Sequence, residues 1–196
     1  MAQGKLFANP VLLPPGLIYR PDFITPAEES ALLDEIRRLP FQEAQYLQFT
    51  ARRRIASYGV TYDFSTRELL PADPPPSFLS PLRDRVAQWA DIPASRFTHV
   101  LVTEYSTGTP LGWHRDAPDF EVVVGVSLAG PGRMRLRRYP PQKGRNATLS
   151  LDLEPRSAYV LRGEARWHWQ HSIPATKSLR YSITFRTRSG EAKLQS

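Results

Sequence analysis

The sequence predicts an α+β fold, mainly β, in which two flanking N-terminal helices precede a jelly roll or barrel. Helical periodicity is confined to the first half of the chain, where apolar residues recur every three to four positions. From Phe97 onward, short β-rich segments alternate with turn residues, as at residues 99–103 and 121–127. Short strands at this spacing are typical of a jelly roll or a barrel.

The first helix is predicted to begin after Thr25, with Pro26 at its first position and Glu28 completing a capping box. Its apolar stripe consists of Leu32, Leu33, Ile36 and Leu39. The second helix is predicted to follow the prolines at 74–76. Its apolar stripe consists of Phe78, Leu79, Leu82, Val86 and Trp89. We interpret both helices as scaffold.

Length and composition bound the function. A chain of 196 residues fits one domain with an enclosed site, so we expect residues 1–196 to form a single domain. The chain has 26 Lys and Arg and 19 Asp and Glu, which gives a net charge of +7. This charge favours polyanionic partners, with nucleic acid as the first candidate. The alternative is that the charge serves only solubility. The absence of cysteine excludes disulfides and thiolate-bound metals. No segment resembles a signal peptide or a membrane span, so we expect a cytoplasmic monomer without a membrane partner.

Three residues have the chemistry of a metal site. In an extended backbone, His114 and Asp116 point to one side, and His171 can supply a third ligand from a later strand. Two histidines and one carboxylate form the facial triad that suits non-haem Fe(II), leaving positions for a bidentate cosubstrate and O2. Taken alone, the pair is more often a surface or structural pair than a metal site.

The segment 180–186 alternates strictly between polar and apolar residues. One face carries Arg180, Ser182, Thr184 and Arg186, and the other carries Tyr181, Ile183 and Phe185. The polar face either meets solvent, as is common in antiparallel sheets, or lines the interior of a jelly roll. In the interior, an arginine could hold a dicarboxylate with two charge-assisted bonds.

These motifs together resemble the AlkB-like branch of the 2-oxoglutarate dioxygenases. The resemblance rests on the order His114-x-Asp116, His171 and Arg180-x5-Arg186, and it extends over residues 16–188. Residues 167–174 are similar to the family's approach to its second metal histidine. The resemblance implies a double-stranded β-helix (jelly roll) and oxidative dealkylation with Fe(II), 2-oxoglutarate and O2.

The resemblance also implies individual roles. His114, Asp116 and His171 would be the iron ligands, and Arg180 would bind the distal carboxylate of 2-oxoglutarate. The remaining cosubstrate contacts would be Tyr105, Thr103, Ser182 and Arg186, the last nearer the metal. Thr103 replaces the asparagine of the family's N-x-Y motif, and Ser182 stands where some members carry asparagine. His99 and His168 are interpreted as structural.

Substrate recognition is expected in a lid at residues 44–76. A nucleobase demethylase needs aromatic faces near the iron and cations for the backbone. The candidate substrate residues are Arg52, Arg53, Arg54, Tyr58, Tyr62 and Asp119. A solvated basic hairpin with packing aromatics is the alternative. A second basic cluster consists of Arg133, Arg135, Arg137 and Arg138, whose alternation suggests one exposed strand face.

One position departs from the family. Base-repairing relatives usually place an acidic residue where this chain has Pro118, and Asp119 could substitute through a small shift. The alternatives to nucleobase dealkylation are the same chemistry on a methylated protein or another substrate, and a non-catalytic nucleic-acid-binding module. Around a core at 97–188, we expect an N-terminal extension at 1–15 and a flexible tail at 189–196.

Overall fold

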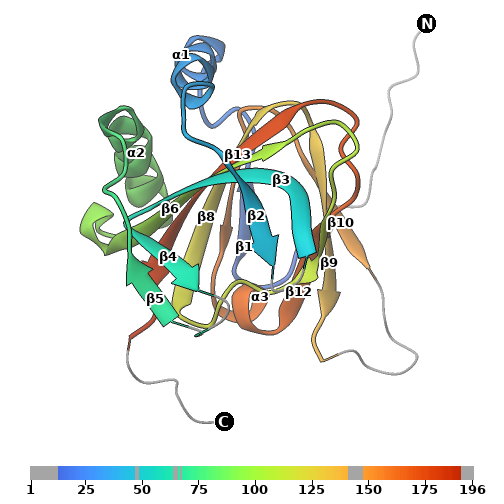
Figure 1. Cartoon of the computed structure of the whole chain (residues 1–196). Coiled ribbons are helices and arrows are strands. Elements are labelled where there is room, and N and C mark those ends of the chain that lie inside the picture. The colour runs from blue at the N-terminus through green and yellow to red at the C-terminus, as the bar shows by residue number, and fades with distance from the viewer. Residues whose placement is uncertain (1–12, 47–48, 64–65, 67, 141–147, 191–196) are drawn as a thin grey trace, which may run out of the picture.

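The fold is a sandwich of two antiparallel sheets with the two longer helices on one side (Figure 1). The computed structural model describes residues 13–46, 49–63, 66, 68–140 and 148–190. The seven-stranded sheet has the order β1 (Leu17–Arg20), β11 (Ala158–Leu161), β8 (Phe120–Ala129), β13 (Arg180–Arg188), β6 (Phe97–Tyr105), β3 (Phe49–Tyr58) and β2 (Gln42–Tyr46). The four-stranded sheet has the order β10 (Leu149–Leu153), β9 (Gly132–Arg138), β12 (Trp169–Ile173) and β7 (Leu111–His114). The predicted jelly roll is confirmed.

The remaining elements are short. A separate hairpin pairs β4 (Val60–Asp63) with β5 (Glu68–Pro71). The helices are α1 (Pro26–Ile36), α2 (Ser80–Ala90) and α3 (Gly163–Trp167), with 3-10 turns η1 (Ser77–Leu79) and η2 (Ala94–Arg96). Among the described residues, no helix is long and apolar enough to cross a membrane.

Both predicted helices are present. Thr25 is the N-cap of α1, its hydroxyl accepts from the Glu28 N–H, and the Glu28 carboxylate accepts from the Thr25 N–H. The helix begins where this capping box satisfies backbone donors that have no partner within the helix. Helix α2 begins at Ser80, after the 3-10 turn η1, and buries Leu82 and Val86.

The two faces of the seven-stranded sheet differ in chemistry. The outer face is apolar and packs against α1 and α2, with Ile183, Phe185, Val86 and Ile36 all fully buried. The inner face meets the four-stranded sheet and carries the polar side of β13. A second apolar cluster, which includes Met134, lies between the two sheets.

The seven-stranded sheet recruits strands from outside the range predicted for the core. Strand β1 pairs with β11, and β3, which lies in the predicted lid, pairs with β6 in register from Arg54↔Glu104 to Tyr58↔Val100. The lid strands therefore continue the sheet that holds β13, which fixes their side chains relative to the inner face.

Candidate active site

A cavity of about 540 Å³ opens between the two sheets. The sequence-predicted residues among those lining it are Arg53, Thr103, Tyr105, His114, Asp116, His171, Arg180, Ser182 and Arg186. The polar face of β13 therefore lines the interior, because the helices cover the opposite, apolar face.

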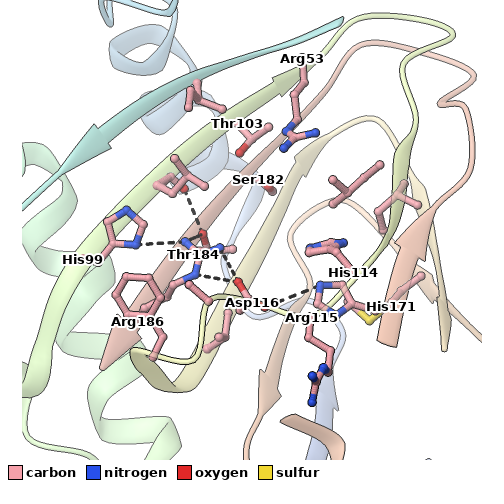
Figure 2. A pocket seen from close by; sticks show the side chains of 18 of the residues that line it. Arg53, His99, Thr103, His114, Arg115, Asp116, His171, Ser182, Thr184 and Arg186 are labelled. Carbon is pink, nitrogen blue, oxygen red and sulfur yellow. Dashed lines mark hydrogen bonds and ion pairs between the residues drawn. The ribbon is translucent and has the colours of Figure 1, made fainter. Parts of the chain in front are cut away.

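The three proposed metal ligands converge in this cavity. His114 ends β7, Asp116 follows it, and His171 lies opposite His114 in the register of β12 with β7. Their ligand atoms all lie within 4.8 Å of one another, and Nε2 of His171 is 3.8 Å from Oδ2 of Asp116 (Figure 2). Nδ1 of His114 bonds the Gly112 carbonyl at 2.9 Å, which orients the ring and leaves Nε2 for a metal.

The protonation states suit a metal. Burial and, to a smaller extent, the charge of His114 lower the pKa of His171 to about 3. Burial also lowers the pKa of His114. For Asp116, burial raises the pKa, but the surrounding cations, Arg186 foremost, outweigh burial and hold the pKa well below its ordinary value. Two neutral imidazoles and one carboxylate at neutral pH are the donor set that non-haem Fe(II) prefers.

Arg186 connects Asp116 to a polar network inside the cavity (Figure 2). Its Nε and Nη2 both lie 2.9 Å from Oδ1 of Asp116, and its Nη1 donates to the Thr184 hydroxyl at 2.8 Å. Nη1 is also 3.3 Å from Nδ1 of His99, whose Nε2 is 3.0 Å from the Ser57 hydroxyl. The sequence predicts only a structural role for His99, whereas the structure places it in the cavity wall.

Arg180 is a buried cation without a matching anion. It is only 2% exposed, its Nε donates to the Ser127 hydroxyl at 3.1 Å, and its guanidinium lies 5.1 Å from the Tyr105 ring. Within the described ranges, no carboxylate lies within 4 Å of it. A Cβ on Gly132 would come within 2.8 Å of Nε, so glycine makes room for this side chain. Because an uncompensated buried charge is costly, this pocket fits a carboxylate ligand.

Arg166, a residue that sequence reasoning missed, holds the loop after the metal pair. It is buried, and its Nη2 donates to the carbonyls of Asp116, Ala117 and Phe120 at 3.2, 2.6 and 2.7 Å. Its location in the short helix α3, 50 residues from Asp116, gave no sequence signal. The contacts fix the backbone that carries the Asp116 carboxylate.

The predicted lid residues separate onto two faces of β3. Arg53 lines the cavity, whereas Arg54 points away and makes two bonds, of 2.8 and 2.9 Å, to the buried Glu104. Arg52 is exposed, and Tyr58 is buried in the apolar core beneath the helices. A core position cannot offer Tyr58 to a stacked base. The side chain of Tyr62 lies outside the described residues.

The loop after Asp116 does not supply a carboxylate to the cavity. Pro118 lines it, but Asp119 is absent from the described lining residues, and its carbonyl accepts from the Ser189 N–H at 2.7 Å. The small shift that would let Asp119 replace an acidic residue at position 118 is not seen. Ser189, assigned to the tail, is instead tied to this loop.

Comparisons with known proteins agree with this geometry. The model of the 2OG-Fe(II) oxygenase superfamily matches residues 16–186. The chain is 32% identical over 185 residues to an Alkylated DNA repair protein ALKBH8 homolog of Arabidopsis thaliana, covering 83% of this chain and 52% of that protein. It is 28% identical over 117 residues to a Probable RNA/DNA demethylase ALKBH6 of Danio rerio, covering 60% and 47%. It thus spans about half the length of these two relatives. The solved structure of OsALKBH1 superposes with a TM-score of 0.74 at 16% identity, covering 89% of this chain and 98% of that one.

The chain therefore belongs to the 2OG-Fe(II) oxygenase superfamily, whose members use Fe(II), 2-oxoglutarate and O2. The triad of His114, Asp116 and His171 fits the iron. Within the superfamily, the chain is similar in sequence to AlkB homologues and in fold to OsALKBH1.

Proposed function

We propose that this dioxygenase oxidatively removes alkyl groups from nucleobases in DNA or RNA. The observation that carries the proposal is the convergence of a facial triad and an unpaired, buried arginine in one cavity. A non-catalytic nucleic-acid-binding module has no need of either. The names of the two relatives, a DNA repair protein and an RNA/DNA demethylase, support a nucleic-acid substrate.

In this proposal, His114, Asp116 and His171 hold the iron. The lowered pKa values of both histidines keep their imidazoles neutral near neutral pH, so each has one ring nitrogen without a proton, and Arg186 keeps Asp116 ionised and fixes its orientation. Arg186 is thus a positioning residue for the carboxylate ligand. Iron bound here would supply the activation of O2 that is coupled to decarboxylation of 2-oxoglutarate.

Arg180 is proposed to bind the distal carboxylate of 2-oxoglutarate. A guanidinium can donate two parallel bonds to a carboxylate, and burial strengthens both. Ser182 and Thr103 lie opposite each other in the register of β13 with β6, and Tyr105 lies opposite Arg180. These three buried side chains line the cavity and offer hydroxyl groups to the rest of the cosubstrate.

The proposed reaction consumes one O2 and one 2-oxoglutarate for each alkyl group. One oxygen atom enters the new carboxyl group of succinate, carbon dioxide leaves, and the other oxygen atom hydroxylates the N-alkyl carbon. The N-hydroxyalkyl product then loses formaldehyde, when the group is methyl, and restores the N–H of the base. The chain contributes positioning and a cavity with restricted access to water.

The predicted second basic cluster provides a candidate surface for the nucleic-acid backbone. Arg133, Arg135 and Arg137 alternate along β9 with Met134 and Leu136, which are buried between the sheets, so the arginines form the outer face. We call these three residues the β9 arginine face. Arg138 departs from the alternation and pairs with Glu164 at 2.7 Å.

Two arginines of this face keep their full charge. Arg135 donates to the Ser172 hydroxyl at 3.2 Å and Arg137 to the Gln170 amide oxygen at 2.9 Å, both neutral partners. In the described part of the chain, neither has a carboxylate within 4 Å, whereas Arg133 pairs with Asp152 at 2.6 Å. Uncompensated cations on one strand face can track phosphates.

The decisive test is product formation with purified protein. We expect iron-dependent conversion of 2-oxoglutarate to succinate, stimulated by oligonucleotides with N-methylated bases, with formaldehyde released in equal amount. Methylated peptides are the matched control substrates. Stoichiometric formaldehyde from peptides and none from oligonucleotides would replace the proposal by the protein-substrate alternative.

A salt titration tests the nucleic-acid surface separately. For single-stranded DNA, the slope of log affinity against log salt is shallower by about 0.7 for each phosphate that the protein no longer neutralises. Replacing both Arg135 and Arg137 by Gln should flatten the slope by about twice that amount, while Arg133→Gln, which removes a paired charge, should change it less. An unchanged slope in the double variant would remove the β9 arginine face from the interface.

A further inference from the structure

The cavity is lined almost entirely by one sign of charge. Asp116 is the single carboxylate among the described lining residues. The cations that line the same cavity are Arg53, Arg115, Arg166, Arg180 and Arg186. Because Asp116 already pairs with Arg186, it is not available to a positively charged substrate.

The net charge of the cavity stays positive when Fe(II) and 2-oxoglutarate are bound. The two positive charges of Fe(II) are matched by the two negative charges of 2-oxoglutarate, and Asp116 matches one arginine. Arg166 remains cationic against backbone carbonyls, which are neutral acceptors. The potential met by an incoming base is therefore set by arginines.

Arg53 places one of these charges in the cavity wall that β3 forms. Figure 2 shows its side chain extending from above the cavity toward the region between Thr103 and His114. The position follows from strand alternation, since Ile55 and Ser57, two and four residues later on β3, line the same cavity.

Among the described residues, the opposite wall supplies no compensating anion. Pro118 lines the cavity, and Asp119 is outside the described lining. Pro118 has no side-chain acceptor for the exocyclic amine of a cationic base. The loop cannot adjust easily, because Arg166 holds the carbonyls on both sides of it.

We infer that this cavity selects neutral or anionic alkylated bases over cationic ones, with Arg53 as the main specificity-determining residue. The inference rests on the proposed nucleobase function. A cationic base, such as one methylated on a ring nitrogen that carries no proton, would meet like charge in a partly desolvated site, and such contacts oppose binding. Methylated lysine is disfavoured for the same reason.

The test compares two bases that carry methyl on the same ring nitrogen. 3-Methylcytosine is cationic at neutral pH and 3-methyluracil is neutral, so otherwise identical oligonucleotides differ only in the pyrimidine. Affinity is measured without oxygen, with Fe(II) and 2-oxoglutarate bound, and formaldehyde release is measured in air. We expect 3-methyluracil to be favoured on the order of tenfold or more in both.

Charge-reversal variants test which residue causes the preference for the neutral base. Arg53→Glu should reduce the preference for 3-methyluracil by at least about tenfold, and Pro118→Asp should shift it in the same direction. Arg83→Glu on α2 changes the net charge equally and should leave the ratio unchanged. Arg53→Gln should lie between the wild type and Arg53→Glu.

The outcomes separate this inference from the proposed function. Equal affinities, a preference for 3-methylcytosine, or a ratio that Arg53→Glu does not alter would overturn the charge selection. Charge-ordered binding without formaldehyde release from either oligonucleotide would retain the selection and refute nucleobase demethylation.

Discussion

Replacing Arg180 by Met is predicted to stabilise the ligand-free protein and to abolish its response to 2-oxoglutarate. Arg180 is 2% exposed, and its guanidinium Nε bonds only the neutral Ser127 hydroxyl. Replacing a buried ion pair with apolar side chains of similar volume is often stabilising by about 1–4 kcal/mol, and Arg180 has no ion-pair partner among the described residues to offset its desolvation. For a chain of this length, each kcal/mol raises the melting temperature by about 2–4 °C. The ligand-free variant should therefore melt several degrees above the wild type.

Thermal unfolding with and without cosubstrate measures both effects. With metal present, 2-oxoglutarate at about 100 times its Kd should stabilise the wild type by about 2.7 kcal/mol, whereas Arg180→Met should not respond. Arg180→Lys should respond weakly, because an ammonium group cannot form the two-bonded contact.

Arg186→Met is the matched control for a paired arginine. It leaves the buried Asp116 carboxylate without its 2.9 Å partner and should destabilise the ligand-free protein by about 3–5 kcal/mol. If Arg180→Met also destabilised the protein and retained its response to 2-oxoglutarate, Arg180 would be a structural residue and the cosubstrate assignment would be wrong.

Four further predictions concern the metal, its loop and the helix cap. Asp116→Ala should abolish succinate formation while circular dichroism still reports a folded protein, and full activity would remove the triad assignment. Arg166→Leu, which breaks three bonds to the metal loop, should weaken iron binding and cost about 3 kcal/mol or more in urea unfolding. Thr25→Ala should cost about 1 kcal/mol. The bond from Arg85 lowers the pKa of Glu28 to about 2. The ionised Glu28 carboxylate therefore stabilises the folded protein above pH 4.5, and this stabilisation is lost as the pH falls toward 2. This exposed carboxylate contributes at most about 1 kcal/mol, and Glu28→Gln should remove that pH dependence.

Local sequence patterns were sufficient to predict the main helices and strands and many of the residues that line the cavity. The capping box at Thr25 placed the start of α1, and alternation on β13 placed Arg180 and Arg186 on one face. Alternation also contained the information that Arg53 lies on the opposite face from Arg54. The sequence analysis treated the three consecutive arginines as one cluster and did not apply this alternation. In the structure, Arg54 pairs with Glu104 and does not reach the cavity.

Long-range contacts explain the residues that were missed. His99 enters the site because β6 and β13 pair in a register that brings it opposite Arg186, 87 residues later. Arg166 reaches Phe120 across 46 residues from a five-residue helix. Neither contact follows from a local period, because sheet order and register decide both.

The polar interior depends on the apolar outer face of the same sheet. Strand β13 buries eight of its nine residues, and those on the inner face include the site arginines. Burying such groups costs free energy unless they are paired. On the outer face, Ile183 and Phe185 are fully buried against the helices, and two large apolar side chains contribute about 1.5–3 kcal/mol each. Helices α1 and α2, which the sequence analysis interpreted as scaffold, thus offset the free energy cost of burying polar groups in the cavity. Truncating Phe185 should therefore lower stability by about 3–5 kcal/mol although it faces away from the iron site.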